Sequence, residues 1–350
     1  MEISLKESNR ELPWVTFCMT TYKRPVLLKK QIATILKQTF SNFAIIISDN
    51  DPEVSARDIV NSFNDPRINY SANEANLGMI KSFNRSLDKA KSEYVVMISD
   101  DDPVYPDMLQ TLFDLSIKYP GYGMYMGGCD WFCEDKEVAK LYKLRVGTNS
   151  CISNEHDLNF VQEFSTPDFI KTLFSFGIFS HFLWSTCVIK KQVLISMGGV
   201  PDYGTPFLGD YAFMSIASTD KGCVVINKSL GCQTIHKENF GRNQNDHLPL
   251  LTKNFPGYLD DKLSNLKEWP EIRKIMLRFF GLWITGHMAF LHHYYKKQNL
   301  PDNGLSMAEK EVFRNDFVKK FRIKYFLKKN FPTIHDEVVK VKKAIIGKRK

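Results

Sequence analysis

The chain has 350 residues, of which 43% are hydrophobic and 25% charged, a balance typical of a soluble globular protein with a large core in one large domain or two smaller ones. Its formal charge of +8 is concentrated at one end, because residues 318–350 hold twelve Lys and Arg against two acids, a local charge of +10 that leaves −2 for residues 1–317. This distribution argues against a nucleic-acid-binding core, and it favours a basic tail that either touches an anionic partner or is simply solvated.

The N-terminus and the cysteines both indicate a cytoplasmic protein. Residues 1–7 carry two acids and no long apolar run, so they do not resemble a secretory signal. The seven cysteines are an odd number, and several lie inside apolar runs, which favours buried reduced thiols. We therefore expect a cytoplasmic location.

From residue 15 to residue 98, apolar strand-like runs alternate with helical patterns. The predicted strands are 15–20, 43–48, 67–70 and 94–98, and the predicted helices run from Pro25 to Lys37, from Pro52 to Val60 and through Ile80 to Leu87. An alternation of this kind predicts a parallel sheet with right-handed crossovers and helices on its faces, an α/β fold.

The most informative stretch is the run Val95–Ile98, which ends at Ser99 and three consecutive acids, Asp100 to Asp102. The acids follow a predicted central strand, so they belong at the edge of the sheet where α/β proteins bind ligands. Three adjacent carboxylates repel one another unless a cation lies among them, and oxygen ligands suit Mg²⁺ or Mn²⁺. The alternative is a solvated acidic turn that caps the helix beginning at Pro106.

No glycine-rich phosphate-binding motif is present. The sequence has no Gly-x-Gly-x-x-Gly after the first strand and no Gly-Lys-Ser/Thr loop, which argues against a dinucleotide-binding fold and a P-loop. Any phosphate would then be bound through the metal.

The second half is less regular. We expect strands at 122–128, 184–189, 224–226 and 230–235, helices at 169–176, 190–197 and 211–218, and acceptor-side loops between 130 and 165.

Six landmarks in order resemble the family 2 glycosyltransferases of the GT-A fold. They are T-T-Y-K-R-P, S-D-N, N-E-A-N-L-G, S-D-D-D-P-V-Y-P, G-G-V-P and L-G-D-Y-A-F, within residues 14–240. The resemblance implies a GT-A sheet that is mostly parallel, a nucleotide-sugar donor, transfer with inversion, and a DXD-type metal site at the acid cluster.

The same resemblance assigns the donor site residue by residue. Thr20, Tyr22 and Arg24 would line the base and ribose, and Asp49 would bond the base imide. Asn76 and Gly78 would lie near the ribose and diphosphate, with Asn84 and Arg85 on the same helix. Asp100 would face the ribose.

The metal ligands are less sharply assigned, because Ser99 stands where family members often have the first acid. Asp101 or Asp102 would hold Mn²⁺ or Mg²⁺, and His236 would complete the shell unless it is a structural histidine. Lys237 or Arg242 would bind the diphosphate.

Asp210 is the expected general base. It opens a predicted helix in the segment that resembles the family's acceptor loop, and an attacking hydroxyl must lose its proton to a nearby carboxylate. A plain helix cap is the alternative role, and Asp202 is the reserve candidate for the base.

After Pro256 the composition changes to helical patterns. A predicted helix at 272–296 is nearly long enough to span a bilayer, but Arg278 and three nearby histidines argue against insertion. We therefore expect a catalytic domain at 1–255, with a nucleotide-sugar half at 14–106 and an acceptor half at 107–255, followed by a helical region at 256–350. Its basic amphipathic tail suits an anionic membrane surface or a solvated helix face.

These features together predict a glycosyltransferase of surface polysaccharide or glycoconjugate synthesis. The expected partners are a UDP-, dTDP- or CDP-sugar and a glycan or lipid-linked acceptor, with peripheral contact to the inner face of the plasma membrane, self-association through the C-terminal helices and no nucleic acid. The rival functions are a nucleotidyltransferase on a similar sheet, which would normally have a glycine-rich loop after the first strand, and an inactive nucleotide- or glycan-binding module.

Overall fold

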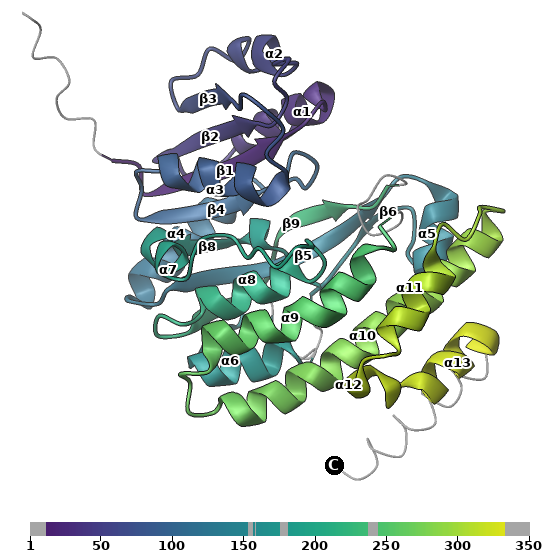
Figure 1. Cartoon of the computed structure of the whole chain (residues 1–350). Helices are drawn as coiled ribbons and strands as arrows, with labels where there is room; N and C mark the ends of the chain where they lie inside the picture. The colour runs from purple at the N-terminus through teal and green to yellow at the C-terminus, as the bar shows by residue number, and fades with distance from the viewer. Residues whose placement is uncertain (1–11, 153–156, 158, 176–180, 237–243, 333–350) are drawn as a thin grey trace, which may run out of the picture.

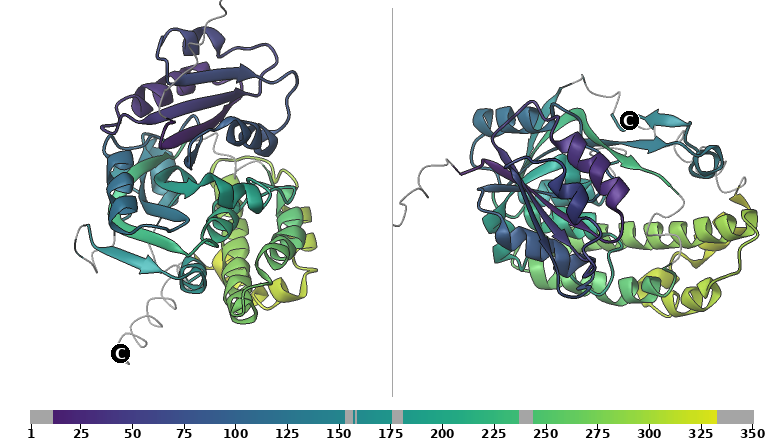
Figure 2. Two further views of the ribbon diagram at one scale, coloured as in Figure 1. Left: turned by 90° about the vertical axis from the view of Figure 1, so that its left-hand side faces the viewer. Right: turned by 90° about the horizontal axis from the view of Figure 1, so that it is seen from above.

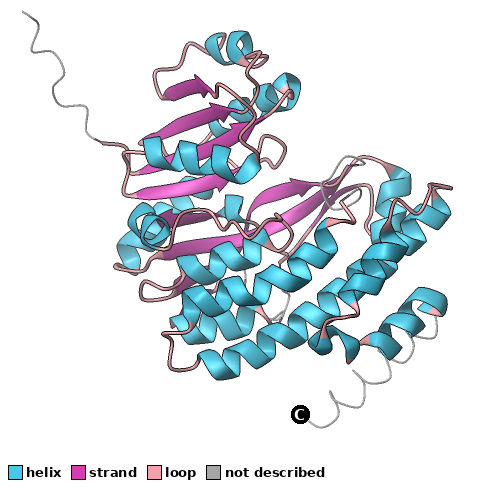
Figure 3. Ribbon diagram, in the orientation of Figure 1, coloured by secondary structure: helices cyan, strands magenta, loops and turns pink. Residues whose placement is uncertain are grey.

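The computed structural model describes residues 12–152, 157, 159–175, 181–236 and 244–332. Within these residues a mixed sheet of nine strands is flanked by helices, and a layer of long helices from the C-terminal region packs beside its second half (Figures 1 and 3). The order of the paired strands is β3-β2-β1-β4-β8-β5-β9-β7, and β6 pairs with β5.

The first half is the parallel α/β unit that the alternating pattern predicts. Its elements are β1 (Val15–Thr21), α1 (Pro25–Ile35), β2 (Phe43–Asp49), α2 (Arg57–Asn61), β3 (Ile68–Ala72), α3 (Met79–Lys89) and β4 (Tyr94–Ile98). All ladders among these four strands are parallel. Every residue of β4 is buried, because helices cover both faces of the strand, and this explains its unbroken apolar run.

The second half mixes strand directions. Its elements are α4 (Met108–Lys118), β5 (Met124–Cys133), α5 (Lys136–Tyr142), β6 (Gly147–Asn149), β7 (Val161–Phe164), α6 (Thr166–Leu173), β8 (Cys187–Lys190), α7 (Lys191–Ser196), α8 (Gly209–Ala217) and β9 (Cys223–Thr234). β8 runs antiparallel to both β4 and β5, whereas β5 and β9 are parallel. The predicted GT-A architecture is confirmed, with a parallel first half and a mixed sheet overall.

Three local expectations were wrong. The strands predicted at 224–226 and 230–235 form one strand, β9, whose register against β5 shifts on either side of Gly128. Residues 184–186 form a 3-10 turn rather than the start of a strand. The stretch 130–165, expected as loops, contains the end of β5 together with α5, β6 and β7.

The seam between the two halves is short. Only Tyr94 and Val95 of β4 pair with β8, opposite Lys190 and Ile189. The rest of β4 pairs with β1 alone. Among the described residues, the end of β4 therefore has no ladder partner on the side facing the second half of the molecule, where Thr234 of β9 contacts the acids instead.

The C-terminal helices are α9 (His247–Leu263), α10 (Trp269–Lys297), α11 (Leu305–Val312), α12 (Asp316–Lys319) and α13 (Arg322–Asn330). They share one hydrophobic cluster with the sheet and with α8, and the stacked rings of Phe255 and Phe280 lie 5.5 Å apart within it. The domain boundary expected after residue 255 lies inside α9. Figure 2 shows these helices side by side along one flank of the molecule. Among the described helices, α10 included, none is both long enough and apolar enough to cross a bilayer.

Candidate active site

The acid cluster lies where the sequence predicts it, directly after β4 and at the carboxyl end of the parallel strands. Asp100 is almost fully buried, and the Thr21 hydroxyl at the end of β1 donates to its Oδ2 at 2.7 Å. Burial raises the pKa of Asp100 to about 6, although the neighbouring Arg24 charge opposes this shift. Asp100 is therefore a buried anchor of the cluster, held by β1.

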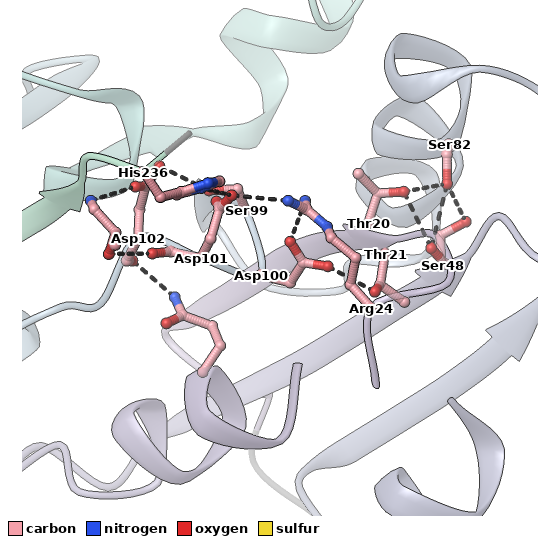
Figure 4. A network of polar contacts seen from close by, with 12 residues as sticks. Thr20, Thr21, Arg24, Ser48, Ser82, Ser99, Asp100, Asp101, Asp102 and His236 are labelled. Carbon is pink, nitrogen blue, oxygen red and sulfur yellow. Dashed lines mark hydrogen bonds and ion pairs between the residues drawn. The ribbon is translucent and has the colours of Figure 1, made fainter. Parts of the chain in front are cut away.

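Arg24 lies over the cluster (Figure 4). Its guanidinium is paired with Asp100 and also donates to Asp101 Oδ2 at 2.8 Å, while two-fifths of the side chain remains exposed. A single arginine thus balances part of the negative charge of two acids. That Arg24 lines the base and ribose stays a prediction, and the structure adds its contact with the acids.

Asp101 and His236 are the two residues that best fit a divalent cation. His236 Nε2 lies 3.5 Å from Asp101 Oδ2, so one ion at ~2.1 Å from each donor fits between them. Burial by itself would raise the pKa of Asp101, but the nearby imidazole of His236 and the charge of Arg24 outweigh this effect and lower the pKa, which keeps Asp101 ionised. Mg²⁺ and Mn²⁺ usually keep several waters and bind phosphate oxygens, so two protein ligands are enough for a metal that arrives with the donor.

Asp102 is turned to other partners. The Ser99 hydroxyl donates to one of its oxygens at 2.8 Å, and the Thr234 N–H at the end of β9 donates to the other at 3.1 Å. Burial and the adjacent Asp101 raise the pKa of Asp102. The described residues contain no group of three or more His, Cys, Asp or Glu gathered as metal ligands. The geometry therefore favours Asp101 over Asp102 as the direct ligand, and the metal itself stays a prediction.

Asp210 lies in the other half of the molecule, close enough to the cluster for its charge to act on Asp102. It is the second residue of α8 and does not cap that helix, since its Oδ1 accepts instead from the Trp184 N–H at 3.1 Å. Burial raises its pKa to about 6, and its charge contributes to the raised pKa of Asp102. By contrast, Asp202 is exposed and accepts from the Gly204 N–H at 3.2 Å in its own turn.

Two pairs of packed rings lie in the same half of the molecule as Asp210. Trp131, at the end of β5, stacks on His181 with ring centroids 4.6 Å apart. Phe182 packs edge-on against Tyr211, the residue after Asp210, at 5.1 Å. These rings were not singled out from the sequence, because nothing local indicates that residue 131 meets residue 181 or that residue 182 meets residue 211.

Thr20 and Tyr22, which we expect to line the base and ribose, lie at the end of β1 and just after it. The Thr20 hydroxyl donates to Ser82 Oγ on α3 at 2.6 Å and lies 3.2 Å from the Ser48 carbonyl of β2, as Figure 4 shows. Thr20 therefore ties α3 to two strands. Tyr22 is 43% exposed, which leaves its ring accessible to a base.

Asp49 is less accessible than its expected role requires. It is fully buried, its Oδ2 accepts from the Tyr70 hydroxyl at 2.6 Å, and its Oδ1 accepts from the Asp51 N–H at 3.0 Å. Contact with a base imide needs this buried carboxylate to become accessible. Its assignment as a base-binding residue stays a prediction.

Asn76 and Gly78 form the loop before α3. The side chain of the buried Asn50 donates to Asn76 Oδ1 at 2.6 Å, and the Gly78 N–H donates to the same oxygen at 2.9 Å. Gly78 has a φ of +79° and no atom within 4 Å of where a β-carbon would lie, so this loop is open to a ligand. Asn50 and its partner Asn73 were missed in the sequence, although each follows a predicted strand.

Asn84 on α3 ties this helix to the turn that follows α7, and its place in the donor site stays a prediction. Its Oδ1 accepts from the Val200 N–H at 2.7 Å, and Gly199 is left without a β-carbon because one would collide with the Asn84 side chain. Arg85, the next residue, is partly buried. Lys237 and Arg242, expected to bind the diphosphate, lie outside the described residues.

A family model described as "Glycosyl transferase family 2" matches residues 16–193, just over half of the chain. A curated relative, the GalNAc(5)-diNAcBac-PP-undecaprenol beta-1,3-glucosyltransferase of Campylobacter jejuni, is 30% identical over 186 residues, which are 52% of this chain and 53% of the relative. The matched region thus spans about half the length of that relative.

Two solved structures are similar in fold. Residues 1–349 of TarS from S. aureus, in complex with UDP, match with a TM-score of 0.55 and 14% identity over 89% of this chain and 91% of theirs. The mannosyltransferase PcManGT from Pyrobaculum calidifontis, in complex with GDP-Man and Mn²⁺, matches with a TM-score of 0.53 and 15% identity over 92% of this chain and 88% of its own. At such identities the likeness concerns the fold.

Proposed function

Because the chain belongs to glycosyl transferase family 2, we propose that it transfers a sugar from a nucleotide-sugar donor to a hydroxyl group of a glycan or lipid-linked acceptor, with inversion at the anomeric carbon. The reaction would serve the synthesis of a surface polysaccharide or other glycoconjugate. The name of the Campylobacter relative, which includes an undecaprenol-linked glycan, supports an acceptor of this kind.

The observation that carries the proposal is the position of Asp210, in the half of the molecule that contacts the acid cluster through Thr234, close enough for its charge to act on Asp102. The Asp210 carboxylate is partly buried, does not cap its helix, and has a pKa raised to about 6, which suits a group that is ionised near neutral pH yet basic enough to take a proton. The acids at the end of β4 belong to the donor and Asp210 belongs to the acceptor. A reaction between two bound substrates requires this division.

In the proposed mechanism, Asp210 accepts the proton of the acceptor hydroxyl as its oxygen attacks the anomeric carbon from the face opposite the nucleotide. The bond from that carbon to the diphosphate breaks, and the electron pair leaves with the diphosphate. The Trp184 N–H keeps the Asp210 carboxylate oriented toward the acceptor. Asp101 and His236 would hold Mn²⁺ or Mg²⁺, which stabilises the negative charge of the leaving diphosphate when bound.

A pyrimidine nucleotide is the proposed donor class, with UDP-, dTDP- and CDP-sugars as candidates. The UDP complex of TarS supports UDP as the first to test, because the fold is shared. Tyr22, Asp49 and the open loop at Asn76 and Gly78 would surround the base and ribose. We place the protein in the cytoplasm, at the inner face of the plasma membrane where a lipid-linked acceptor is reached, and self-association through the C-terminal helices is part of the same proposal.

The decisive experiment incubates the purified protein with a panel of nucleotide-sugars and an undecaprenyl-diphosphate-linked glycan, and follows both nucleotide release and the mass of the acceptor. One donor should release its nucleotide diphosphate and add one sugar, with Asp210→Asn as the inactive control. Formation of a nucleotidyl product with release of pyrophosphate would instead favour the nucleotidyltransferase alternative.

A further inference from the structure

Helix α13 carries an apolar face that no other described element covers. Ile323 is 77% exposed, Phe326 55% and Phe331, just after the helix, 46%. Ile323 and Phe326 are three residues apart and so lie on the same side of the helix, and the rings of Phe326 and Phe331 are 6.0 Å apart. Figures 1 and 2 place α13 at the outer edge of the helical layer. We call Ile323, Phe326 and Phe331 the apolar ridge; exposed aromatic and aliphatic groups gathered in this way mark an interaction surface.

The opposite face of α13 is fixed to the protein. Tyr325 is 3% exposed, and the preceding Phe321 lies on Gly281 of α10, where a β-carbon would collide with its ring. The imidazole of His293 on α10 lies 3.2 Å from the Lys328 carbonyl. These contacts hold α13 in one orientation.

Glu309 of α11 adds a charged anchor to the same face. Its Oε2 lies 2.9 Å from His292 Nε2 on α10 and 3.0 Å from Lys329 Nζ on α13. One carboxylate thus joins three helices. The apolar ridge is therefore presented rigidly, rather than on a flexible arm.

The charge around the ridge selects the kind of partner. α13 contains Arg322, Lys324, Lys328 and Lys329 and no acid, but Lys329 is paired with Glu309 and Lys328 Nζ lies over Gly286 of α10. The exposed cations beside the ridge are Arg322 and Lys324, with Lys320 just before the helix, whereas the exposed Lys319 is paired with Asp316. A symmetric contact between two copies through this face would bring these cations against their own copies, which is unfavourable. An anionic surface with an apolar interior matches both the cations and the apolar side chains.

We propose that the apolar ridge of α13 inserts into an anionic lipid surface, with its flanking cations against the lipid phosphates. This inference rests on the proposed function in one respect: a lipid-linked acceptor gives such a surface its purpose. Because α13 is fixed to α10 and α11, insertion would set the orientation of the whole catalytic unit relative to the bilayer. Binding would involve this helix itself and would not depend on the remaining residues of the basic tail alone.

The test measures sedimentation of the full-length protein with vesicles of phosphatidylglycerol and phosphatidylcholine, and with vesicles of phosphatidylcholine alone. The variant Ile323→Ser/Phe326→Ser should bind the anionic vesicles at least roughly tenfold more weakly than the unmodified chain, because two inserted apolar side chains are lost. The matched control is Ile117→Ser/Ile195→Ser, which removes apolar residues that are 67% and 40% exposed on α4 and α7, at the other side of the molecule in Figure 1. The control should bind like the unmodified chain.

Each outcome decides the inference separately from the proposed function. Sugar transfer to a soluble acceptor should be unchanged in both double variants, and thermal unfolding should confirm that both fold. Equal vesicle binding by the ridge variant and the unmodified chain would overturn the proposal, as would a dimer in solution that the ridge variant abolishes. Ridge-dependent vesicle binding by a protein that transfers no sugar would support the membrane surface and contradict the proposed function.

Discussion

At the scale of single residues, Asp210 is placed to accept a proton rather than to cap its helix. The variant Asp210→Asn keeps the shape and can still accept from the Trp184 N–H, but it cannot take a proton. We expect its turnover to fall by about 10²–10⁴, the usual contribution of a general base, with donor affinity unchanged. Steady-state kinetics and calorimetric titration of the nucleotide-sugar would measure the two effects.

The pH dependence of the same residue supplies the control. Only ionised Asp210 accepts a proton, so turnover should rise as pH increases through about 6, and this rise should be absent from the residual activity of Asp210→Asn.

The contribution of Asp210 to folding stability should fall as pH increases. A carboxyl whose pKa is raised on folding from 3.8 to about 6 contributes stability below this range that is lost as pH rises through it. Asp210→Asn should therefore melt no lower than the unmodified chain above about pH 6, and a clear drop in melting temperature with normal turnover would return Asp210 to a structural role.

Asp101 and Asp102 should respond differently to the same substitution. Asp101→Asn replaces one of the two side chains that would bind the metal, the other being His236, so we expect a severe loss of activity. In thermal-shift experiments, nucleoside diphosphates should also lose their Mn²⁺-dependent stabilisation of this variant. Asp102→Asn should be milder, because Ser99 and Thr234 already occupy both of its oxygens. A chelator should abolish transfer by the unmodified enzyme. Undiminished transfer in chelator, or equal losses in the two variants, would contradict this division of roles.

The sequence predicts where the charged residues of the candidate site lie better than it predicts which residues they contact. Asp100, Asp101 and Arg24 lie next to the ends of apolar strands, and the sheet edge at which those ends meet follows from the alternation of elements. The contacts of Thr21, Ser99 and Thr234 depend on which strands become neighbours across tens of residues, and no local pattern encodes that. Asp49 is buried beneath Tyr70 for the same reason, since the pairing of β2 with β3 brings the two residues together.

At the scale of elements, two helical glycines offer a matched comparison. Gly281 in α10 lies under the Phe321 ring, whereas Gly257 in α9 has open space where a β-carbon would lie. Alanine favours a helix interior over glycine by about 1 kcal/mol, so Gly257→Ala should raise the free energy of unfolding. Gly281→Ala should lower it by roughly 1–3 kcal/mol, because Phe321 must move. Denaturant unfolding would measure both, and stabilisation by Gly281→Ala would show that Phe321 is not packed as described.

Element types followed from the sequence wherever a run was long and strongly patterned. Burial on both faces makes a strand a continuous apolar run, as in β1, β2 and β4. A sustained helical spacing of apolar residues identifies the long helix α10. β7 was missed because three of its four residues are exposed in part or in full, so its sequence resembles a loop. β9 was divided in two because Asn227, Lys228 and Ser229 interrupt its apolar run at the place where its register against β5 shifts.

At the scale of the whole molecule, the C-terminal helices and the catalytic half share one core. Phe213 of α8, Phe255 of α9 and Phe280 of α10 belong to the same cluster of buried residues. We expect a single cooperative unfolding transition, seen at the same denaturant concentration by far-ultraviolet circular dichroism and by tryptophan fluorescence. Two separated transitions would indicate that the helices beyond residue 255 form an independent domain.

The short ladder between β4 and β8 also has a consequence for synthesis on the ribosome. The ribosome makes the four parallel strands one after another within residues 15–98, whereas it makes β8 only when it reaches residues 187–190. At ~5–20 residues per second, the nascent chain carries β4 for about 4–18 seconds before its neighbour exists. During that interval β4 can pair with β1 on one side, but its other edge is exposed and its sequence is apolar throughout, the kind of edge that recruits other chains. The yield of folded protein should therefore depend on chaperones that bind nascent chains, and slower translation between the codons for Ile98 and Cys187 should increase aggregation.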